Sequence, residues 1–283
     1  MESMESMESM ESMESIETME SISSGESITS NIPLIANFFR APTDNDTGFG
    51  NWLAKDWRIN RLDSPRVVTV FDTADPEHPK AINIHTNKQQ VNQKNYHFAK
   101  GYITVTTSQE LQTDGSVIIT QTYDCHGDLP ELPRMGMMIT LPRDFEQVAW
   151  YGRGPWESYP DRKESTRIGQ WTSTVTAQYT HYPRPQDSGN HEDCSSVLLS
   201  APDGKTLRVE AIDHPFSFSA LHYTPQQLAA AKHDFELQEQ GHTYLYIDCA
   251  VMGLGNGSCG PGVLKKYCIS PGKHVLRIRV SEK

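Results

Sequence analysis

Aromatic and charged side chains are concentrated in residues 150–171, which read WYGRGPWESYPDRKESTRIGQW. The side chains of interest are the rings of Trp150, Tyr151, Trp156 and Tyr159 and the charged groups of Arg153, Glu157, Asp161 and Arg162. Aromatic faces beside hydrogen-bonding groups can stack on a sugar ring, and they can equally fill the core between two sheets. The charged groups can form surface ion pairs of little energetic weight. Residue types alone leave sugar binding and core packing open.

Glycine and proline residues separate these rings. Gly152, Gly154 and Pro155 fall between Tyr151 and Trp156. Glycine and proline at this density argue against a helix, because they interrupt its backbone and favour turns. The pattern predicts a strand that ends in a tight loop.

A second candidate segment is residues 37–50, NFFRAPTDNDTGFG. Asp44 and Asp46 could begin a calcium loop, but the glycine and the terminal glutamate of an EF-hand are absent from the required positions. We therefore expect no calcium site and predict a network between Arg40 and the nearby carboxylates that fixes the loop. A turn with no functional contact remains an alternative, since buried arginine–carboxylate pairs also occur in structural loops.

A third candidate segment is residues 181–193, HYPRPQDSGNHED, which has no apolar pattern. Its Gln186, Asp187 and Asn190 side chains could hydrogen-bond a sugar. They could equally satisfy the backbone of a long turn, which the residues alone favour. Polar connections of this kind usually run over the surface, so we expect a surface loop here.

The five cysteines do not suggest a metal or disulfide framework. Their number is odd, their spacing is irregular and no CxxC motif occurs, which argues against a zinc site or a set of disulfides. Cys249 and Cys268 lie in apolar surroundings and are predicted to be core residues. Cys259 differs, because it lies with Asn256 and Ser258 among five glycines. Such a loop lets the backbone approach a ligand or a neighbouring domain closely.

The elements that must position these groups are mostly strands. Alternating or β-branched segments predict strands over residues 67–72, 81–86, 102–108, 115–124, 135–141, 147–151, 167–171, 195–200, 206–212, 216–221, 243–251 and 274–280. Residues 88–100 are polar and predict a loop or an edge strand. Helices are predicted over 51–62, capped by Asn51, and over 223–233, where Thr224 can cap and Pro225 suits the first turn. Many antiparallel strands with one or two short helices predict an all-β fold of two large packed sheets.

The composition separates a tail from a single folded domain. Residues 1–30 begin with repeated MES triplets, and the first 26 residues contain eight of the glutamates that give the chain its net charge of −11. A three-residue period supports neither helix nor strand, so we predict a disordered low-complexity tail over 1–30 and one domain over 31–283. No basic stripe suggests nucleic acid binding.

Membrane and export signals are also missing from the sequence. No apolar run reaches the length of a membrane span, and the start lacks a secretory signal. The cysteines suit a reducing compartment. We expect a cytoplasmic protein, with the periplasm possible if the chain belongs to a longer precursor.

The order of residues carries more information than the composition. GRGPWESYPDRKES at 152–165 resembles the signature of the C-terminal domain, or small chain, of the bacterial β-galactosidases of glycoside hydrolase family 2. NFFRAPTDND at 37–46, PELPRMGM at 130–137 and MGLGNGSCGPGV at 252–263 resemble further segments of that domain in the same order. RPQDSGN at 184–190 is similar to a family loop near the domain interface. The resemblance extends from about residue 33 to residue 283.

The resemblance implies a fold and a division of labour. The fold would be the large antiparallel supersandwich shared with galactose mutarotase-like proteins. The enzyme would be a retaining β-galactosidase that hydrolyses terminal non-reducing β-D-galactosides such as lactose. Its two catalytic carboxylates and its magnesium and sodium would lie mainly on a separate catalytic barrel, so we assign this chain no catalytic residue and no metal ligand. The chain alone would be inactive and would wall one side of the active-site pocket.

The resemblance also sorts the candidate residues. The pocket lip would contain Cys259, Ser258, Asn256, Gln186, Asp187 and Asn190. The interface with the barrel and its structural support would contain Arg40, Asp44, Asp46, Arg153, Trp156, Glu157, Tyr159, Asp161 and Arg162. In well-known members of the family a tryptophan at the position of Cys259 stacks on the sugar, whereas this chain has no tryptophan after Trp171. The substrate preference then differs, or another domain supplies the ring.

Two functions from other classes stay open. A stand-alone carbohydrate-binding domain could use the aromatic residues between Trp150 and Tyr159 as its platform. An aldose epimerase on the same fold would need a positioned histidine and glutamate for acid–base work. The chain has eleven histidines, but none lies in a motif expected for such an epimerase.

Overall fold

A computed structural model describes residues 34–48, 52–72 and 89–283. The predicted tail over 1–30, the predicted strand over 81–86 and the predicted cap Asn51 lie outside the described residues.

The described part of the chain forms two antiparallel sheets, as the sequence predicts. The five-stranded sheet has the order β1-β6-β13-β12-β9, in which β1 is Leu34–Asn37, β6 is Arg134–Pro142, β13 is His242–Val251, β12 is Phe216–Leu221 and β9 is His191–Cys194. The nine-stranded sheet has the order β2-β3-β4-β5-β14-β11-β10-β7-β8, formed by Arg66–Asp72, Gln89–His97, Gly101–Leu111, Val117–Gly127, Lys273–Glu282, Thr206–Ala211, Ser196–Ser200, Gln147–Gly154 and Arg167–Thr174. All these pairings are antiparallel.

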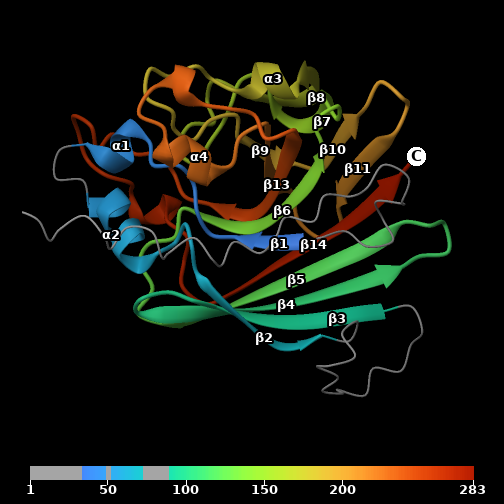
Figure 1. The fold of residues 1–283 in the computed structure, drawn as a ribbon, viewed down its shortest axis with the longest axis horizontal. Coiled ribbons are helices and arrows are strands. Elements are labelled where there is room, and N and C mark those ends of the chain that lie inside the picture. Colours follow the sequence, from blue (N-terminus) through green and yellow to red (C-terminus); the bar gives the residue numbers. More distant parts are fainter. Residues whose placement is uncertain (1–33, 49–51, 73–88) are drawn as a thin grey trace, which may run out of the picture.

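The nine-stranded sheet curves around the five-stranded one. In Figure 1 strands β2 to β5 form the lower layer, and the sheet then rises through β14, β11 and β10 to β7 and β8 at the top. Strand β6 lies between β1 and β13 and is buried along nearly its whole length. The core between the sheets is apolar and includes Ile119, Val197, Val209, Phe218, Leu245, Ile247 and Ile278.

Sequence alternation explains most of the strands. In β5 the side chains of Val117, Ile119 and Tyr123 are buried and alternate with partly exposed neighbours, because successive residues of a strand point to opposite faces. β14 contains the predicted 274–280 segment and buries Leu276, Ile278 and Val280 in the same way.

The prediction for residues 88–100 is wrong on one point. The segment contains strand β3, which pairs with β2 on one side and β4 on the other, so it is an interior strand. Its polar side chains hydrogen-bond across the sheet, Gln93 Nε2 to Thr106 Oγ1 at 2.9 Å and Thr104 Oγ1 to Asn95 Oδ1 at 2.9 Å. Cross-strand polar pairs of this kind stabilise a sheet without an apolar pattern.

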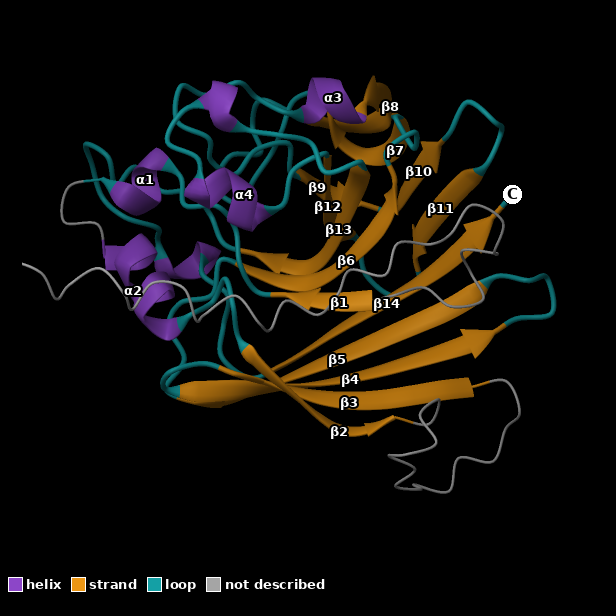
Figure 2. Cartoon of the chain, in the orientation of Figure 1, coloured by secondary structure: helices purple, strands orange, loops and turns teal. Residues whose placement is uncertain are grey.

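The helices are short and lie at the periphery (Figure 2). They are α1 at Asp44–Thr47, α2 at Trp52–Asn60, α3 at Val175–Gln178 and α4 at Pro225–Ala230, with 3₁₀ turns η2 at Asp234–Glu236 and η3 at Lys265–Tyr267. Thr224 caps α4 and Pro225 begins it, as predicted. The helix ends at Ala230, three residues before the predicted end, because Ala231 is extended and the Lys232 N–H bonds the Glu236 carboxylate instead.

The stretch at 150–171 begins in strand β7, passes through the predicted tight loop and ends in strand β8, which pairs with β7. Strand β7 ends at Gly154, and Tyr159 and Arg162 then form a backbone bridge. Trp150 and Tyr159 are buried, whereas Trp156 is 70% exposed. None of the helices in the described residues is long and apolar enough to cross a membrane.

Candidate functional site

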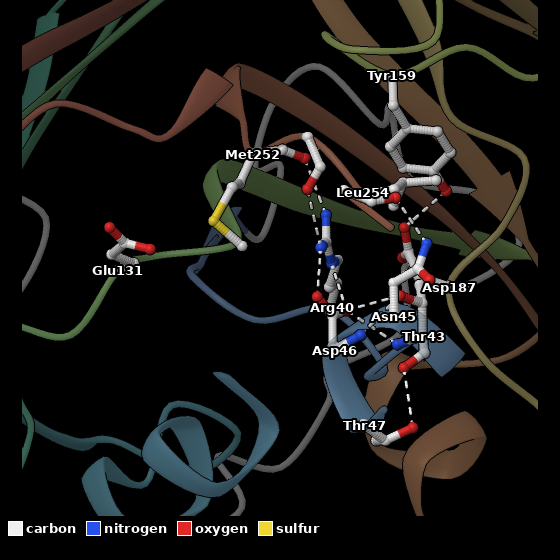
Figure 3. Close-up of polar contacts among 12 residues, drawn as sticks. Arg40, Thr43, Asn45, Asp46, Thr47, Glu131, Tyr159, Asp187, Met252 and Leu254 are labelled. Carbon is white, nitrogen blue, oxygen red and sulfur yellow. Dashed lines mark hydrogen bonds and ion pairs between the residues drawn. The ribbon is translucent and has the colours of Figure 1, made fainter. Parts of the chain in front are cut away.

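The candidate segments, far apart in the sequence, meet in space. The helix α1 from the 37–50 segment contacts both residues 186–190 and the loop at 252–263, hereafter the glycine loop. The 150–171 stretch reaches the same loop through Asp161. Figure 3 shows Arg40, Asn45, Asp187, Tyr159, Met252 and Leu254 grouped in one region.

Arg40 is the first of two buried arginines in this region. Its Nη2 and Nε bind Asp46 Oδ1 and Oδ2 at 2.8 and 3.2 Å. Its Nη1 donates to the Met252 carbonyl at 2.9 Å and its Nη2 also donates to the Gly253 carbonyl at 3.2 Å (Figure 3). Burial alone would lower the pKa of Arg40, but the carboxylates of Asp46 and Asp187, together with Tyr159, outweigh burial and raise that pKa. The predicted network between Arg40 and a carboxylate is therefore present, and it holds the start of the glycine loop.

The two predicted acidic residues of α1 have different partners. Asp46 completes a capping box with Thr43 while it binds Arg40. Asp44 does not contact Arg40. Its backbone N–H donates to Gln186 Oε1 at 2.9 Å, and its carboxylate accepts from Gln186 Nε2 at 3.2 Å. Asp44 thus ties α1 to the 186–190 loop.

Side chains from two other segments fix the glycine loop further along. Asp161 accepts hydrogen bonds from the backbone N–H groups of Leu254 and Gly255 at 2.9 and 2.7 Å. Asn45 donates from Nδ2 to the Gly255 carbonyl at 2.8 Å. Asn45 Oδ1 accepts from the Ser258 N–H at 3.2 Å and from the Ser258 hydroxyl at 2.8 Å.

Close packing explains two of the loop's glycines. A Cβ at Gly253 would lie 2.6 Å from the carboxylate carbon of Asp161, and one at Gly257 would lie 2.5 Å from the Asn45 carbonyl oxygen. Contacts this short do not occur for real Cβ atoms. Asn256 and Cys259 are exposed, and Ser258 is partly exposed. The loop therefore presents its tip outward while its base is packed against the domain.

Arg134 is the second buried arginine, and sequence reasoning missed it. Its Nη1 binds Asp248 Oδ2 at 2.5 Å and Asn190 Oδ1 at 3.2 Å, and its Nη2 binds Asp187 Oδ2 at 3.1 Å. The Tyr159 hydroxyl donates to the same Asp187 oxygen at 2.8 Å. Arg134 lies in the PELPRMGM segment that carried the resemblance, and an arginine at the start of an apolar strand was the available signal.

Two buried groups of this cluster, Asp248 and Tyr159, have raised pKa values. Asp248 is completely buried, and its Oδ1 has no hydrogen-bond partner among the residues that the structure describes. Burial raises the pKa of Asp248 to about 6, although Arg134 opposes the shift. Burial, with Asp187 nearby, also raises the pKa of Tyr159 well above its ordinary value.

The expectation of a surface loop at 181–193 is wrong for its central residues. Gln186, Asp187 and Asn190 are 7%, 8% and 0% exposed. The polar groups of these three side chains are hydrogen-bonded by Arg134, Tyr159 and Asp44. Because paired polar groups lose little free energy on leaving water, these side chains can be buried. Within this chain these side chains are already bonded to protein.

The remaining predicted residues brace the 150–171 stretch. Arg153 Nε binds Asp193 Oδ2 at 2.5 Å. Glu157 accepts from Arg162 Nη1 and from the Gly189 N–H, each at 3.0 Å. Through Glu157 and Gly189 this stretch also contacts the 186–190 loop. Trp156 is exposed to solvent.

The carboxylates of this region are bonded within the chain. Asp46, Asp161 and Asp187 are each engaged by the chain's own donors. Among the described residues no group of three or more His, Cys, Asp or Glu side chains is arranged to hold a metal ion. All five cysteines are free.

A separate cavity of about 390 Å³ lies between the loop that follows β5 and the region of η3. Its lining includes Cys125, Leu129, Glu131, Lys265, Cys268 and Ile269. None of the predicted site residues lines this cavity.

Comparison with known proteins places these features in a family. The family model described as "Beta galactosidase small chain" matches residues 11–280. A β-galactosidase of Staphylococcus xylosus is 34% identical over 233 residues, which are 82% of this chain and 22% of that protein. A β-galactosidase of Alteromonas mediterranea is 32% identical over 259 residues, covering 84% of this chain and 23% of that protein. The chain thus spans about a quarter of the length of these relatives.

A weak similarity to a solved structure is also found. An aldose epimerase homologue from C. elegans aligns with 78% of this chain and 70% of its own, at 9% identity and a TM-score of 0.38. That score is too low to support a conclusion.

Proposed function

The chain belongs to the β-galactosidase small-chain family, and we propose that it walls one side of the active-site pocket of a retaining β-galactosidase. The enzyme would hydrolyse terminal non-reducing β-D-galactosides such as lactose. The observation that carries this proposal is the glycine loop, which the domain fixes through Arg40, Asn45 and Asp161 while its tip stays exposed. A loop held in this way can form a rigid edge against a ligand or a neighbouring domain.

The catalytic groups are proposed to lie outside this chain. A retaining glycosidase needs two carboxylates about 5–5.5 Å apart that flank the scissile bond. The chain corresponds to about a quarter of each relative, so the larger remainder has room for a catalytic barrel. That barrel would belong to the same polypeptide or to a separate large chain. Its magnesium and sodium would be bound there, and we assign no ligand for either ion to this chain.

The proposed lip has a front and a back. Asn256, Ser258 and Cys259 form the front, where the loop is open to solvent or to a ligand. Gln186, Asp187 and Asn190 form the back, since they are buried and hold α1 and Arg134 in place. Cys259 would replace the tryptophan that stacks on the sugar in well-known members, and the loss of that ring would weaken binding at this position.

Reconstitution tests the proposal. The purified chain is mixed with a β-galactosidase large chain that lacks this domain, and hydrolysis of a nitrophenyl β-galactoside is followed. We expect neither component alone to turn over the substrate and the mixture to do so. Turnover by the isolated chain, or a folded complex without any turnover, would overturn the proposal.

One observation favours a second function. Trp156 is 70% exposed and Tyr151 is 48% exposed, so two rings remain available for sugar stacking by an isolated carbohydrate-binding domain. The platform is smaller than expected, because Trp150 and Tyr159 are buried. Saturable galactoside binding by the isolated chain, lost in Trp156→Ala, would support this alternative.

The epimerase alternative gains no such support. Among the described residues, His222 and Glu146 are hydrogen-bonded to each other, with His222 Nε2 2.8 Å from Glu146 Oε2. His222 is only 2% exposed. Because these two side chains are bonded to each other inside the fold, they are not available as an acid and a base for a sugar.

We also propose a cytoplasmic location. All five cysteines are free, and free thiols persist in reducing compartments.

A further inference from the structure

The glycine loop has little backbone support of its own. Its N–H groups donate five backbone hydrogen bonds, of which only those from Asn256, Cys259 and Gly260 stay within the loop, while Met252 and Gly253 bond to the carbonyls of Pro133 and Tyr267. The N–H groups of Leu254 and Gly255 are bonded to a side chain instead. Glycine-rich backbone loses much conformational entropy when it is ordered, so external contacts must supply the order of this segment.

Asp161 and Asn45 supply those contacts at the middle of the loop. Together they make five hydrogen bonds to it, between 2.7 and 3.2 Å. Gly255 is held from both sides, because its N–H donates to Asp161 and its carbonyl accepts from Asn45. Asn45 then reaches Ser258, next to Cys259.

Asn45 and Asp161 act on a different part of the glycine loop from the buried ion pair of Arg40 and Asp46. Arg40 and Asp46 fix the carbonyls of Met252 and Gly253 at the base. Asn45 and Asp161 fix the segment that leads to the tip. Asn45 and Asp161 are partly exposed and lie outside the hydrophobic core, so their replacement should free the tip and leave the fold intact.

We infer that Asn45 and Asp161 are positioning residues for galactoside binding, which they promote by holding residues 256–259 against the bound sugar. The inference rests on the proposed function. A tip that is free to move adopts the binding-competent position only part of the time, and the apparent dissociation constant rises by the inverse of that fraction. The chemical step is unaffected once the sugar is bound, because neither residue touches the reacting atoms. Loss of either residue should therefore raise KM and leave kcat nearly unchanged.

Kinetics of the reconstituted enzyme tests the inference. Asp161→Asn loses one of two acceptor oxygens and places an amide donor against a backbone N–H. Asn45→Ala removes the contacts to Gly255 and Ser258. Hydrogen bonds to a charged carboxylate are among the stronger ones in proteins, so we expect KM to rise about tenfold or more while kcat changes less than about twofold. Asp203→Asn is the matched control, because Asp203 also accepts a backbone N–H, from Lys205, in a turn between β10 and β11.

Hydrogen exchange on the isolated chain separates failure of this inference from failure of the proposed function. In Asp161→Asn and Asn45→Ala, the amides of residues 254–259 should exchange faster than in the Asp203→Asn control, with the strands unchanged. A wild-type mixture without activity would refute the proposed function, and the exchange result would still stand. Three results would overturn the positioning role. They are faster exchange with KM unchanged, unaltered exchange in both variants, and a fall in kcat as large as the rise in KM.

Discussion

The two buried arginines bind carboxylates, and each joins parts of the chain that are far apart in the sequence. Arg40 joins Asp46 to the base of the glycine loop, and Arg134 joins Asp187 to Asp248. A buried ion pair gives little net stability compared with an apolar replacement, but removal of one partner leaves an uncompensated buried charge. These residues should therefore be sensitive to single substitutions.

Replacement of Asp46 with alanine tests this at the first arginine. We expect the free energy of unfolding in urea to fall by about 3–5 kcal/mol, the usual effect of breaking a buried pair. The control is Glu239→Ala, which breaks the partly exposed contact between Arg143 and Glu239 and should lower the free energy by less than about 1 kcal/mol. Equal losses in the two variants would contradict the assignment of Arg40 and Asp46 as a buried pair.

Asp248 should make stability depend on pH. Its pKa is raised from 3.8 to about 6 by burial, so the folded state binds a proton that the unfolded state has released. The resulting stability is fully present below pH 3.8 and is lost as pH rises through 6. The pKa of His191 is lowered by burial from 6.5 to about 4, which gives the opposite trend, because stability then rises with pH over that window.

The variant Asp248→Asn separates the two trends. We expect the free energy of unfolding of the wild type, relative to this variant, to fall by about 2.4 kcal/mol between pH 4 and pH 7, since one pKa unit corresponds to about 1.4 kcal/mol and the unfolded carboxyl is already partly ionised at pH 4. Urea titrations of both proteins across this range give the difference. A difference that does not change with pH would show that the pKa of Asp248 is not raised.

At the scale of elements, the glycine loop depends on backbone approach. A Cβ at Gly257 would lie 2.5 Å from the Asn45 carbonyl, whereas a Cβ at Gly262 would meet no atom within 4 Å. We expect Gly257→Ala to lower the free energy of unfolding by about 1–3 kcal/mol, as for other overpacked sites. Gly262→Ala in the same loop should stay within about 0.5 kcal/mol of the wild type. Similar values for the two variants would mean that the close approach at Gly257 is not needed.

The sequence predicts the elements best where one pattern controls them. Alternation identified β14, and the Thr224 cap with Pro225 identified the start of α4. It failed for β3, whose polar side chains bond across the sheet and leave no apolar alternation to detect. It also placed the end of α4 too late, since a contact between Lys232 and Glu236 competes with the helix.

The candidate site shows the same limit. The motifs pointed to the segments that meet, including Arg40, Asn256 and Asp161. Arg134 lies in one of these motifs but was not singled out as a site residue, and Asp248 lies outside them. Arg134 lies on β6 and Asp248 on β13. These strands pair, although the two residues are 114 positions apart in the sequence. Nothing local in either strand indicates that partner. For the same reason the burial of residues 186–190 could not be predicted, because it depends on Arg134.

At the scale of the whole molecule, two antiparallel sheets support a polar end that contains all the family-like segments. The all-β fold predicted from alternation is confirmed by the sheet topology. The chain covers about a quarter of its β-galactosidase relatives, and under the proposed function its activity would belong to a larger assembly with a catalytic barrel. In that assembly Cys259, at the exposed tip of the glycine loop, should face the bound sugar.

The alkylation rate of Cys259 in the active assembly tests this central claim most directly. Cys259 is exposed, while the other four cysteines are buried or partly buried, so a mild thiol reagent followed by peptide mass spectrometry can resolve it. Isopropyl β-D-thiogalactoside at ten times its dissociation constant should slow alkylation of Cys259 about tenfold, because only the unliganded fraction reacts. Alkylation of Cys268 should not change. If the galactoside inhibits the enzyme and Cys259 reacts at its original rate, the glycine loop does not line the sugar pocket.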